Sequence, residues 1–221
     1  MLKGIVFDLD GTLADSLSVT FDGFNHVFMA YGAPELTPHQ IMAYFGTGER
    51  EIIAQVIGEE VDAEVAHEAY VKFCKFTDDS LEKIPFHKGA EELLELLKSN
   101  GVPVAIVTGR SWATTQAILN HHRVMDRFVK VIAHDHVTKP KPAPDGILLA
   151  LDAMKLRGEE IMYVGDSHMD ILAAKAAGAQ SVAALWDFMA NREELEKYGP
   201  HHYAKTPHQV WEAYLKQQKQ P

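Results

Sequence analysis

The chain has 221 residues, of which 47% are hydrophobic and 24% are charged, as in ordinary folded globular proteins. This length fits one large domain or a core with a smaller insert, and the composition excludes disordered and collagen-like chains. The formal net charge of −10 argues against a surface that binds nucleic acid or anionic membranes. A single cysteine, Cys74, allows no intrachain disulfide. With no signal-peptide pattern and no apolar run of about 18 residues, we expect a cytoplasmic protein without a membrane partner.

Five short apolar runs rich in valine and isoleucine predict strands of a parallel sheet that is buried on both faces. They are Gly4–Leu9, Pro103–Thr108, Val129–His134, Ile161–Gly165 and Ser181–Leu185. Helical patterns occur at Lys88–Ser99, Ser111–His121, Asp145–Met154, Met169–Ala177 and Val210–Leu215. This alternation of strands and helices predicts an α/β protein with a doubly wound, Rossmann-like parallel sheet.

The interval between the first two predicted strands is unusually long. It spans some ninety residues, far more than a single crossover helix needs. Residues 16–81 have a helical pattern throughout, with turns at residues 32–34, residues 45–48 and Gly58. We therefore predict an α/β core of residues 1–15 and 82–221, and a helical cap of residues 16–81 inserted after the first strand. The cap is expected to fold over the carboxyl edge of the sheet.

The first predicted strand ends in an Asp-x-Asp-Gly-Thr sequence that begins at Asp8. Side chains alternate along a strand, so Asp8 and Asp10 point the same way, at the edge where open α/β sheets bind ligands. An ordinary Asp-Gly turn is the alternative interpretation. Two adjacent carboxylates repel each other unless a cation or a shared proton lies between them. The pair therefore favours a divalent metal ion.

Two further strand ends carry polar residues. Thr108, Gly109 and Arg110 follow the second strand and directly precede a helix. Free amides and the helix dipole favour phosphate at such a place, although an ordinary helix cap has the same pattern. The fourth strand is followed by Asp166 and, four residues later, by Asp170, which lie on one side if a helix has begun. A cap explains one of these acidic residues but not both.

A stiff segment, Lys-Pro-Lys-Pro-Ala-Pro, precedes the fourth strand. Its prolines can present a lysine rigidly to a carboxylate-rich site, whereas a solvated basic loop is the alternative. Lys139 and Lys141 each begin a Lys-Pro-x-Pro sequence, so the pattern alone does not choose between them.

The sequence resembles the haloacid dehalogenase superfamily, whose four signature motifs match, in order, Asp8-x-Asp10-Gly-Thr12, Thr108, a Lys-Pro-x-Pro lysine and Gly165-Asp166-x-x-x-Asp170. The resemblance spans about residues 1–185 and implies the α/β core described above. A second aspartate in the first motif is typical of the phosphatases of this superfamily and is missing from its dehalogenases. The family usually places its lysine 25 residues before the fourth-motif aspartate, which selects Lys141, with Lys139 as the fallback.

The resemblance implies a phosphatase that acts on a small phosphorylated metabolite. Asp8 would attack phosphorus and form an aspartyl-phosphate, while Asp10 would exchange protons with the leaving group and with water. Thr108 and Lys141 would stabilise the oxygens of the transferred group.

A magnesium ion is the cofactor that the resemblance implies. Asp8, Asp166 and the carbonyl oxygen of Asp10 would bind it. Asp170 would bind either the metal or one of its ligands.

The inserted helices resemble the cap of the phosphoglycolate phosphatase and β-phosphoglucomutase group, and residues 45–50 resemble the cap loop of the phosphatases. Arg50 in this loop has a guanidinium that suits a carboxylate, so phosphoglycolate is the favoured substrate. We expect Gly109 and Arg110 to bind substrate as well. A phosphomutase, a pyrophosphatase and a phosphorylated regulatory module are the alternatives. We expect a monomer or a homodimer.

Other candidate ligands are assigned to the surface or to packing. They are His134, His136 and the pairs His121-His122 and His201-His202, which have no cysteine or acidic partner at zinc spacing. Cys74 lies beside two phenylalanines in a helical pattern, which predicts core packing.

Overall fold

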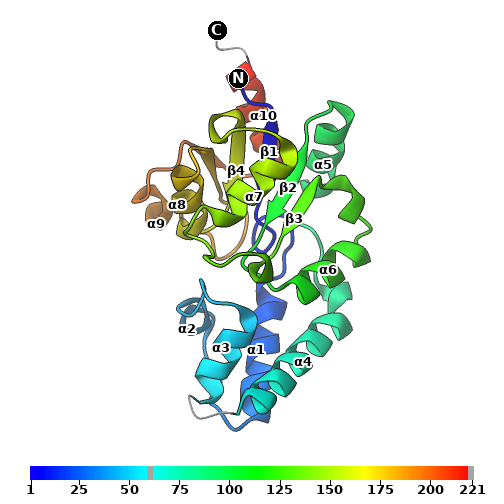
Figure 1. Cartoon of the computed structure of the whole chain (residues 1–221), viewed down its shortest axis with the longest axis vertical. Coiled ribbons are helices and arrows are strands. Elements are labelled where there is room, and N and C mark those ends of the chain that lie inside the picture. The colour runs from blue at the N-terminus through cyan, green and yellow to red at the C-terminus, as the bar shows by residue number, and fades with distance from the viewer. Residues whose placement is uncertain (59–61, 219–221) are drawn as a thin grey trace.

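The computed structural model describes residues 1–58 and 62–218, and a six-stranded parallel sheet forms its centre (Figure 1). The strands are β1 (Gly4–Phe7), β2 (Val104–Val107), β3 (Lys130–Ile132), β4 (Ile161–Gly165), β5 (Gln180–Ala184) and β6 (His202–Ala204). Their spatial order is β3-β2-β1-β4-β5-β6, and Ile5 on β1 lies opposite Val104 on β2 and Met162 on β4. This order confirms the doubly wound α/β core, with the switch in winding direction beside β1.

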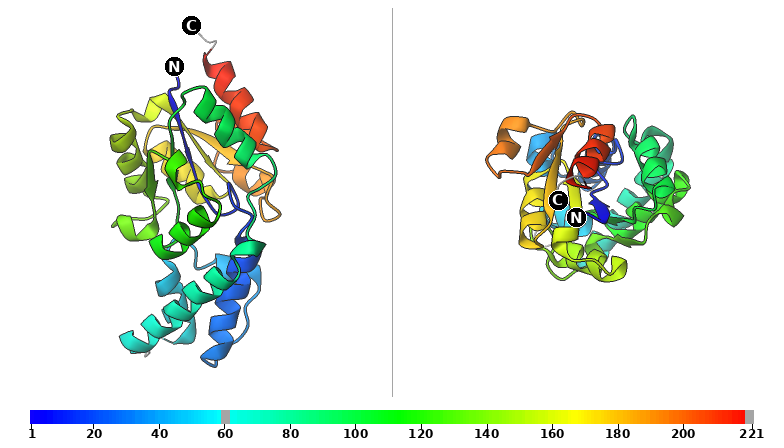
Figure 2. Two further views of the ribbon diagram at one scale, coloured as in Figure 1. Left: turned by 90° about the vertical axis from the view of Figure 1, so that its right-hand side faces the viewer. Right: turned by 90° about the horizontal axis from the view of Figure 1, so that it is seen from above.

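Helices cover both faces of the sheet (Figure 2). Those of the core are α5 (Ala90–Ser99), α6 (Trp112–His121), α7 (Asp145–Met154), α8 (His168–Ala176), α9 (Arg192–Glu196) and α10 (Pro207–Gln218). Successive side chains of β1 point to opposite faces of the sheet. Phe7 packs on one face with side chains of α5, α6 and α10, and Val6 packs on the other face with side chains of α7 and α8. Within the described part of the chain, no helix is long and apolar enough to cross a bilayer.

Four helices form a separate body at the end of the molecule opposite the two termini (Figure 1). They are α1 (Leu17–Ala30), α2 (Pro38–Met42), α3 (Glu49–Ile57) and α4 (Ala63–Asp79). This cap has its own apolar core, in which the rings of Phe24 and Phe73 lie 4.6 Å apart. The turns that the sequence predicts fall between these helices, and Gly58 directly follows α3. We propose that the domain boundaries lie at residues 15–16 and 81–82.

The two linkers between core and cap run side by side. Ala14 of the outgoing linker and Phe86 of the returning one form an antiparallel bridge. The Asp15 N–H donates to the carbonyl oxygen of Pro85 at 2.9 Å, and the His87 N–H donates to that of Leu13 at 2.9 Å. The hinge of the cap is therefore a short two-stranded ribbon.

Candidate active site

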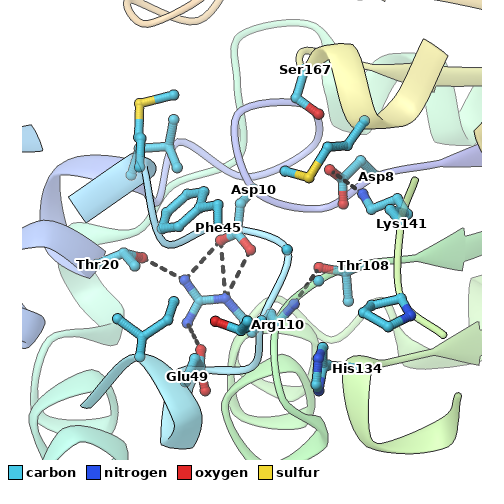
Figure 3. Close-up of a pocket in the computed structure, with 18 of the residues that line it drawn as sticks. Asp8, Asp10, Thr20, Phe45, Glu49, Thr108, Arg110, His134, Lys141 and Ser167 are labelled. Atoms are coloured by element: carbon cyan, nitrogen blue, oxygen red, sulfur yellow. Dashed lines mark hydrogen bonds and ion pairs between the residues drawn. The ribbon is translucent and has the colours of Figure 1, made fainter. Parts of the chain in front are cut away.

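The carboxyl ends of three neighbouring strands converge on a pocket of about 110 Å³ beneath the cap (Figure 3). Asp8 directly follows β1, Thr108 follows β2 and Asp166 follows β4. These three residues line the pocket together with Asp10, Gly109, Arg110 and Lys141 of the core and with Thr20, Phe45 and Glu49 of the cap. The structure thus brings together most of the residues that the sequence selects.

Lys141 joins two of the predicted carboxylates. Its Nζ lies 2.7 Å from Oδ2 of Asp8 and 2.6 Å from Oδ1 of Asp170. Burial alone would lower the pKa of Lys141, but the two carboxylates outweigh it and hold the pKa well above its ordinary value. Lys139 is exposed and does not line the pocket. The geometry therefore favours Lys141, as the spacing predicts.

Asp170 is surrounded by donors. Tyr163 donates its hydroxyl to Oδ1 at 3.1 Å, and Ser167 donates its hydroxyl and its N–H to Oδ2 at 2.6 and 3.0 Å. Burial would raise the pKa of Asp170, but Lys141 and the hydrogen bonds from Ser167 together outweigh burial and lower the pKa. Because both oxygens already accept hydrogen bonds, Asp170 is best suited to hold Lys141 in place behind the metal ligands.

One oxygen each of Asp8, Asp166 and Asp170 lies within 4.8 Å of the others, so Asp8 and Asp166 could hold a divalent ion in front of Asp170. Burial, together with neighbouring carboxylates, raises the pKa of Asp8 to about 7 and that of Asp166 well above its ordinary range. Among the described residues, four carboxyl groups and two cationic side chains line the pocket, a formal excess of two negative charges when all are ionised, which an added cation would offset. An oxygen-only ligand set with surplus negative charge fits magnesium.

Arg110 binds the carboxylate of Asp10. Its Nη2 lies 2.7 Å from Oδ1 of Asp10, and its Nε lies 3.0 Å from both carboxylate oxygens (Figure 3). Burial raises the pKa of Asp10, but this charged, bidentate contact outweighs burial and lowers it. Arg110 contacts the side-chain oxygens of Asp10 and not its backbone carbonyl oxygen, which is the atom expected to bind the metal.

Arg110 also reaches the cap. Its Nη1 lies 3.3 Å from Oε1 of Glu49, the first residue of α3, and its Nη2 donates to the hydroxyl of Thr20 on α1. Glu49 is buried and accepts hydrogen bonds from the hydroxyls of Ser111 and Thr114 on the core side. Burial outweighs these contacts and raises the pKa of Glu49. One guanidinium thus joins the first motif to the cap.

The structure does not bring Arg50 to the pocket. Its side chain is exposed, whereas the adjacent Glu49 faces inward. The pocket-lining role expected of Arg50 is therefore not supported, and Arg110 is occupied by carboxylates of the protein itself. His134, which the sequence assigns to the surface or to packing, instead lines the pocket. Its Nε2 is buried and has no hydrogen-bond partner among the described residues.

Other histidines have local packing roles, as expected. His122 donates from Nε2 to the carbonyl oxygen of Ile84 at 2.7 Å, and Nδ1 of His136 and of His201 accept backbone N–H groups at 3.1 and 3.0 Å. Cys74 is only half-buried on α4, so it lies at the edge of the cap core rather than inside it. Burial raises the pKa of its thiol, which makes it a poor nucleophile.

Comparison with known proteins identifies a family and several relatives. The family model of the haloacid dehalogenase-like hydrolases matches residues 5–184. A phosphoglycolate phosphatase from Xanthomonas campestris pv. campestris strain 8004 is 32% identical over 212 residues, which cover 95% of both chains. Pyrophosphatase PpaX from Anoxybacillus flavithermus is 31% identical over 199 residues, which cover 90% of both chains.

Solved structures share the fold. A predicted phosphoglycolate phosphatase from Haemophilus somnus has a TM-score of 0.85 and 23% identity, covering 96% of this chain and 98% of its own. CbbY from Rhodobacter sphaeroides, solved in complex with phosphate, has a TM-score of 0.82 and 24% identity, covering 95% of this chain and 96% of its own.

Proposed function

The chain belongs to the haloacid dehalogenase-like hydrolase family and is a phosphatase, and on that premise we propose that it is a magnesium-dependent phosphatase that works through an aspartyl-phosphate on Asp8. One observation carries the proposal: Asp8 stands at the carboxyl end of β1, 2.7 Å from Lys141 and within one three-carboxylate group with Asp166. A nucleophile, a fixed cation and ligands for a metal ion therefore meet in one pocket.

Each of these pocket residues has its own role in the proposed reaction. Asp8 attacks phosphorus, and the bond from phosphorus to the leaving oxygen breaks. Lys141 and the Thr108 hydroxyl contact the oxygens of the transferred group, where charge neutralisation and positioning supply most of the catalysis. Asp8 and Asp166 would hold magnesium, which would supply further positive charge to offset the negative charge of the transferred group. Water then cleaves the aspartyl-phosphate and regenerates the Asp8 carboxylate.

Asp10 carries the protons in both halves of this reaction. As an acid it donates a proton to the leaving oxygen, and as a base it accepts one from the attacking water. Arg110 lowers the pKa of Asp10 and so favours its carboxylate, the form that the second half needs.

The pocket favours a small substrate. Its volume of about 110 Å³ is well below the roughly 300–1,000 Å³ of pockets for drug-sized ligands. The names of the relatives make phosphoglycolate the first candidate and pyrophosphate the second. With Arg50 outside the pocket, we propose that Nε2 of His134 binds the carboxylate of phosphoglycolate.

The test compares kcat/KM for phosphoglycolate, pyrophosphate and 2-hydroxyethyl phosphate, which has an alcohol in place of the carboxylate. The variant His134→Gln should lose about tenfold on phosphoglycolate alone, equivalent to about 1.4 kcal/mol of transition-state stabilisation. Arg50→Gln is the matched control and should change no ratio. Equal losses of His134→Gln on all three substrates would contradict the carboxylate contact without touching the phosphatase proposal.

The proposed chemistry has its own test. Asp8→Asn should abolish turnover, and peptide mapping by mass spectrometry of the parent, trapped during turnover, should find phosphate on Asp8 alone. Phosphate on another residue, or full turnover after exhaustive chelation of metal, would contradict the mechanism whatever the substrate.

A further inference from the structure

A second group of metal-ligand side chains lies outside the active site, at the hinge of the cap. Asp15 belongs to the linker that leaves the core, His87 to the linker that returns, and Asp187 to the segment after β5. One ligand atom of each lies within 4.8 Å of the other two. The three residues come from segments about 70 and 100 positions apart in sequence, and the paired linkers bring them together.

Two of these ligand atoms are buried and have no hydrogen-bond partner among the described residues. They are Nε2 of His87 and Oδ2 of Asp187, on side chains that are 9% and 0% exposed. The two atoms face each other at 3.4 Å. The other oxygen of Asp187, Oδ1, accepts the N–H of Met189 at 2.7 Å, which fixes the direction of the carboxylate. Burying polar atoms without partners is costly, so this arrangement favours a further ligand between them.

The separation of 3.4 Å fits a tetrahedral metal ion. Zinc binds imidazole nitrogen and carboxylate oxygen at about 2.0–2.2 Å, so two of its tetrahedral ligands lie roughly 3.4 Å apart. Neighbouring ligands of an octahedral ion at about 2.1 Å would lie roughly 3.0 Å apart. An imidazole ligand also favours zinc over magnesium, which prefers oxygen.

We propose that Asp15, His87 and Asp187 form a zinc site separate from the oxygen-only cluster of the active site. A surface cavity is lined by Asp15, His87 and Trp186, although not by the buried Asp187, so it gives the ion a path to two of the three ligands and room for water as the fourth. Lys88 and Lys205 also line this cavity, but both are exposed to solvent, which screens their charge. Because two ligands lie on the two linkers and the third on the core, bound zinc would restrict movement of the cap.

The experiment measures zinc bound per chain after metal-free protein is dialysed against zinc buffered too low to occupy surface histidines. Zinc also binds oxygen ligands, so Asp166→Asn serves to empty the active site alone. In that background we expect one zinc per chain, and the further changes His87→Gln or Asp187→Asn should weaken its binding on the order of 100-fold. His39→Gln, at an exposed histidine of the cap, is the matched control and should leave the affinity unchanged.

A second readout identifies the nitrogen ligand by spectroscopy. Copper(II) bound in the Asp166→Asn background should show nitrogen hyperfine coupling in its electron paramagnetic resonance spectrum. The long-range ¹⁵N spectrum of the diamagnetic zinc-bound protein should assign Nε2 of His87 as the nitrogen. If His87→Gln and Asp187→Asn fail to fold, zinc affinity is measured on Asp15→Asn instead, because Asp15 is only half-buried; this variant should also bind zinc more weakly. Absence of bound zinc in the Asp166→Asn protein, or zinc that binds equally well after His87→Gln, would overturn the proposal and leave an ordinary ion pair.

Discussion

Replacement of Arg110 by glutamine should destabilise the protein more than any exposed substitution. The Arg110 side chain is 2% exposed and lies 2.7 Å from Asp10 in the core and 3.3 Å from Glu49 in the cap. Its removal leaves the buried Glu49 and the half-buried Asp10 without their shared cation, and the shorter, neutral glutamine cannot neutralise either carboxylate. Breaking a buried ion pair by deleting one partner costs about 3–5 kcal/mol. For a chain of this size, that corresponds to a fall of roughly 6–20 °C in Tm.

Thermal unfolding followed by tryptophan fluorescence measures this loss, since the chain has three tryptophans. Arg110→Lys keeps the charge but loses the bidentate geometry, so its Tm should fall between those of the parent and of Arg110→Gln. Arg50→Gln is the matched control at an exposed arginine and should stay within about 0.5 kcal/mol of the parent.

A double variant isolates the cap contact. Glu49→Gln combined with Arg110→Gln removes one of the two uncompensated carboxylates, so the pair should be more stable than Arg110→Gln alone. A loss below about 1 kcal/mol in Arg110→Gln, or no recovery in the double variant, would show that this network does not join cap and core.

Two further predictions concern the lysine and the metal. Lys141→Ala should lower kcat by about 10²–10³, the usual cost of losing a group that stabilises transition-state charge. Lys139→Ala is the control, and its kcat should stay within about twofold of the parent. Equal losses in the two variants would refute the assignment of Lys141. Without metal, burial raises the pKa of Asp8 from 3.8 to about 7, so its contribution to stability is present below pH 3.8 and lost as pH rises through 7. Magnesium should therefore raise Tm more at pH 8 than at pH 6, and a gain independent of pH would contradict the ligand role of Asp8.

The core was predictable because its strands carry their signal locally. The five predicted strands are mainly apolar, every residue of β1, β2 and β4 is buried, and the bounds of β4 and α7 agree with the prediction. The sequence did not predict the edge strand β6 or the helix α9. The strand has only three residues, one of them a histidine, and the helix has five residues, most of them charged. Short elements of this kind take their conformation from their neighbours, which periodicity does not record.

The active-site residues of the core were predictable for the same reason, since Asp8, Thr108 and Asp166 each adjoin a strand. The cap contribution was not. Glu49 and Arg50 are neighbours at the start of α3, and only the docking of the cap decides that Glu49 faces the pocket. Ligands that meet through tertiary contacts alone, as at the hinge, leave no spacing pattern for sequence analysis to find.

Asp8 and Asp10 stand two residues apart, yet their pKa values move in opposite directions. Burial raises both pKa values, but Asp10 receives the bidentate guanidinium of Arg110, whereas Asp8 pairs with Lys141, which it shares with Asp170. In the proposed reaction the nucleophile must be ionised, so Asp8 depends on an added cation at neutral pH. Asp10 depends instead on Arg110, which the cap also contacts. Metal occupancy would thus govern attack on phosphorus, and cap position would govern proton transfer, which places two steps of one reaction under separate physical control.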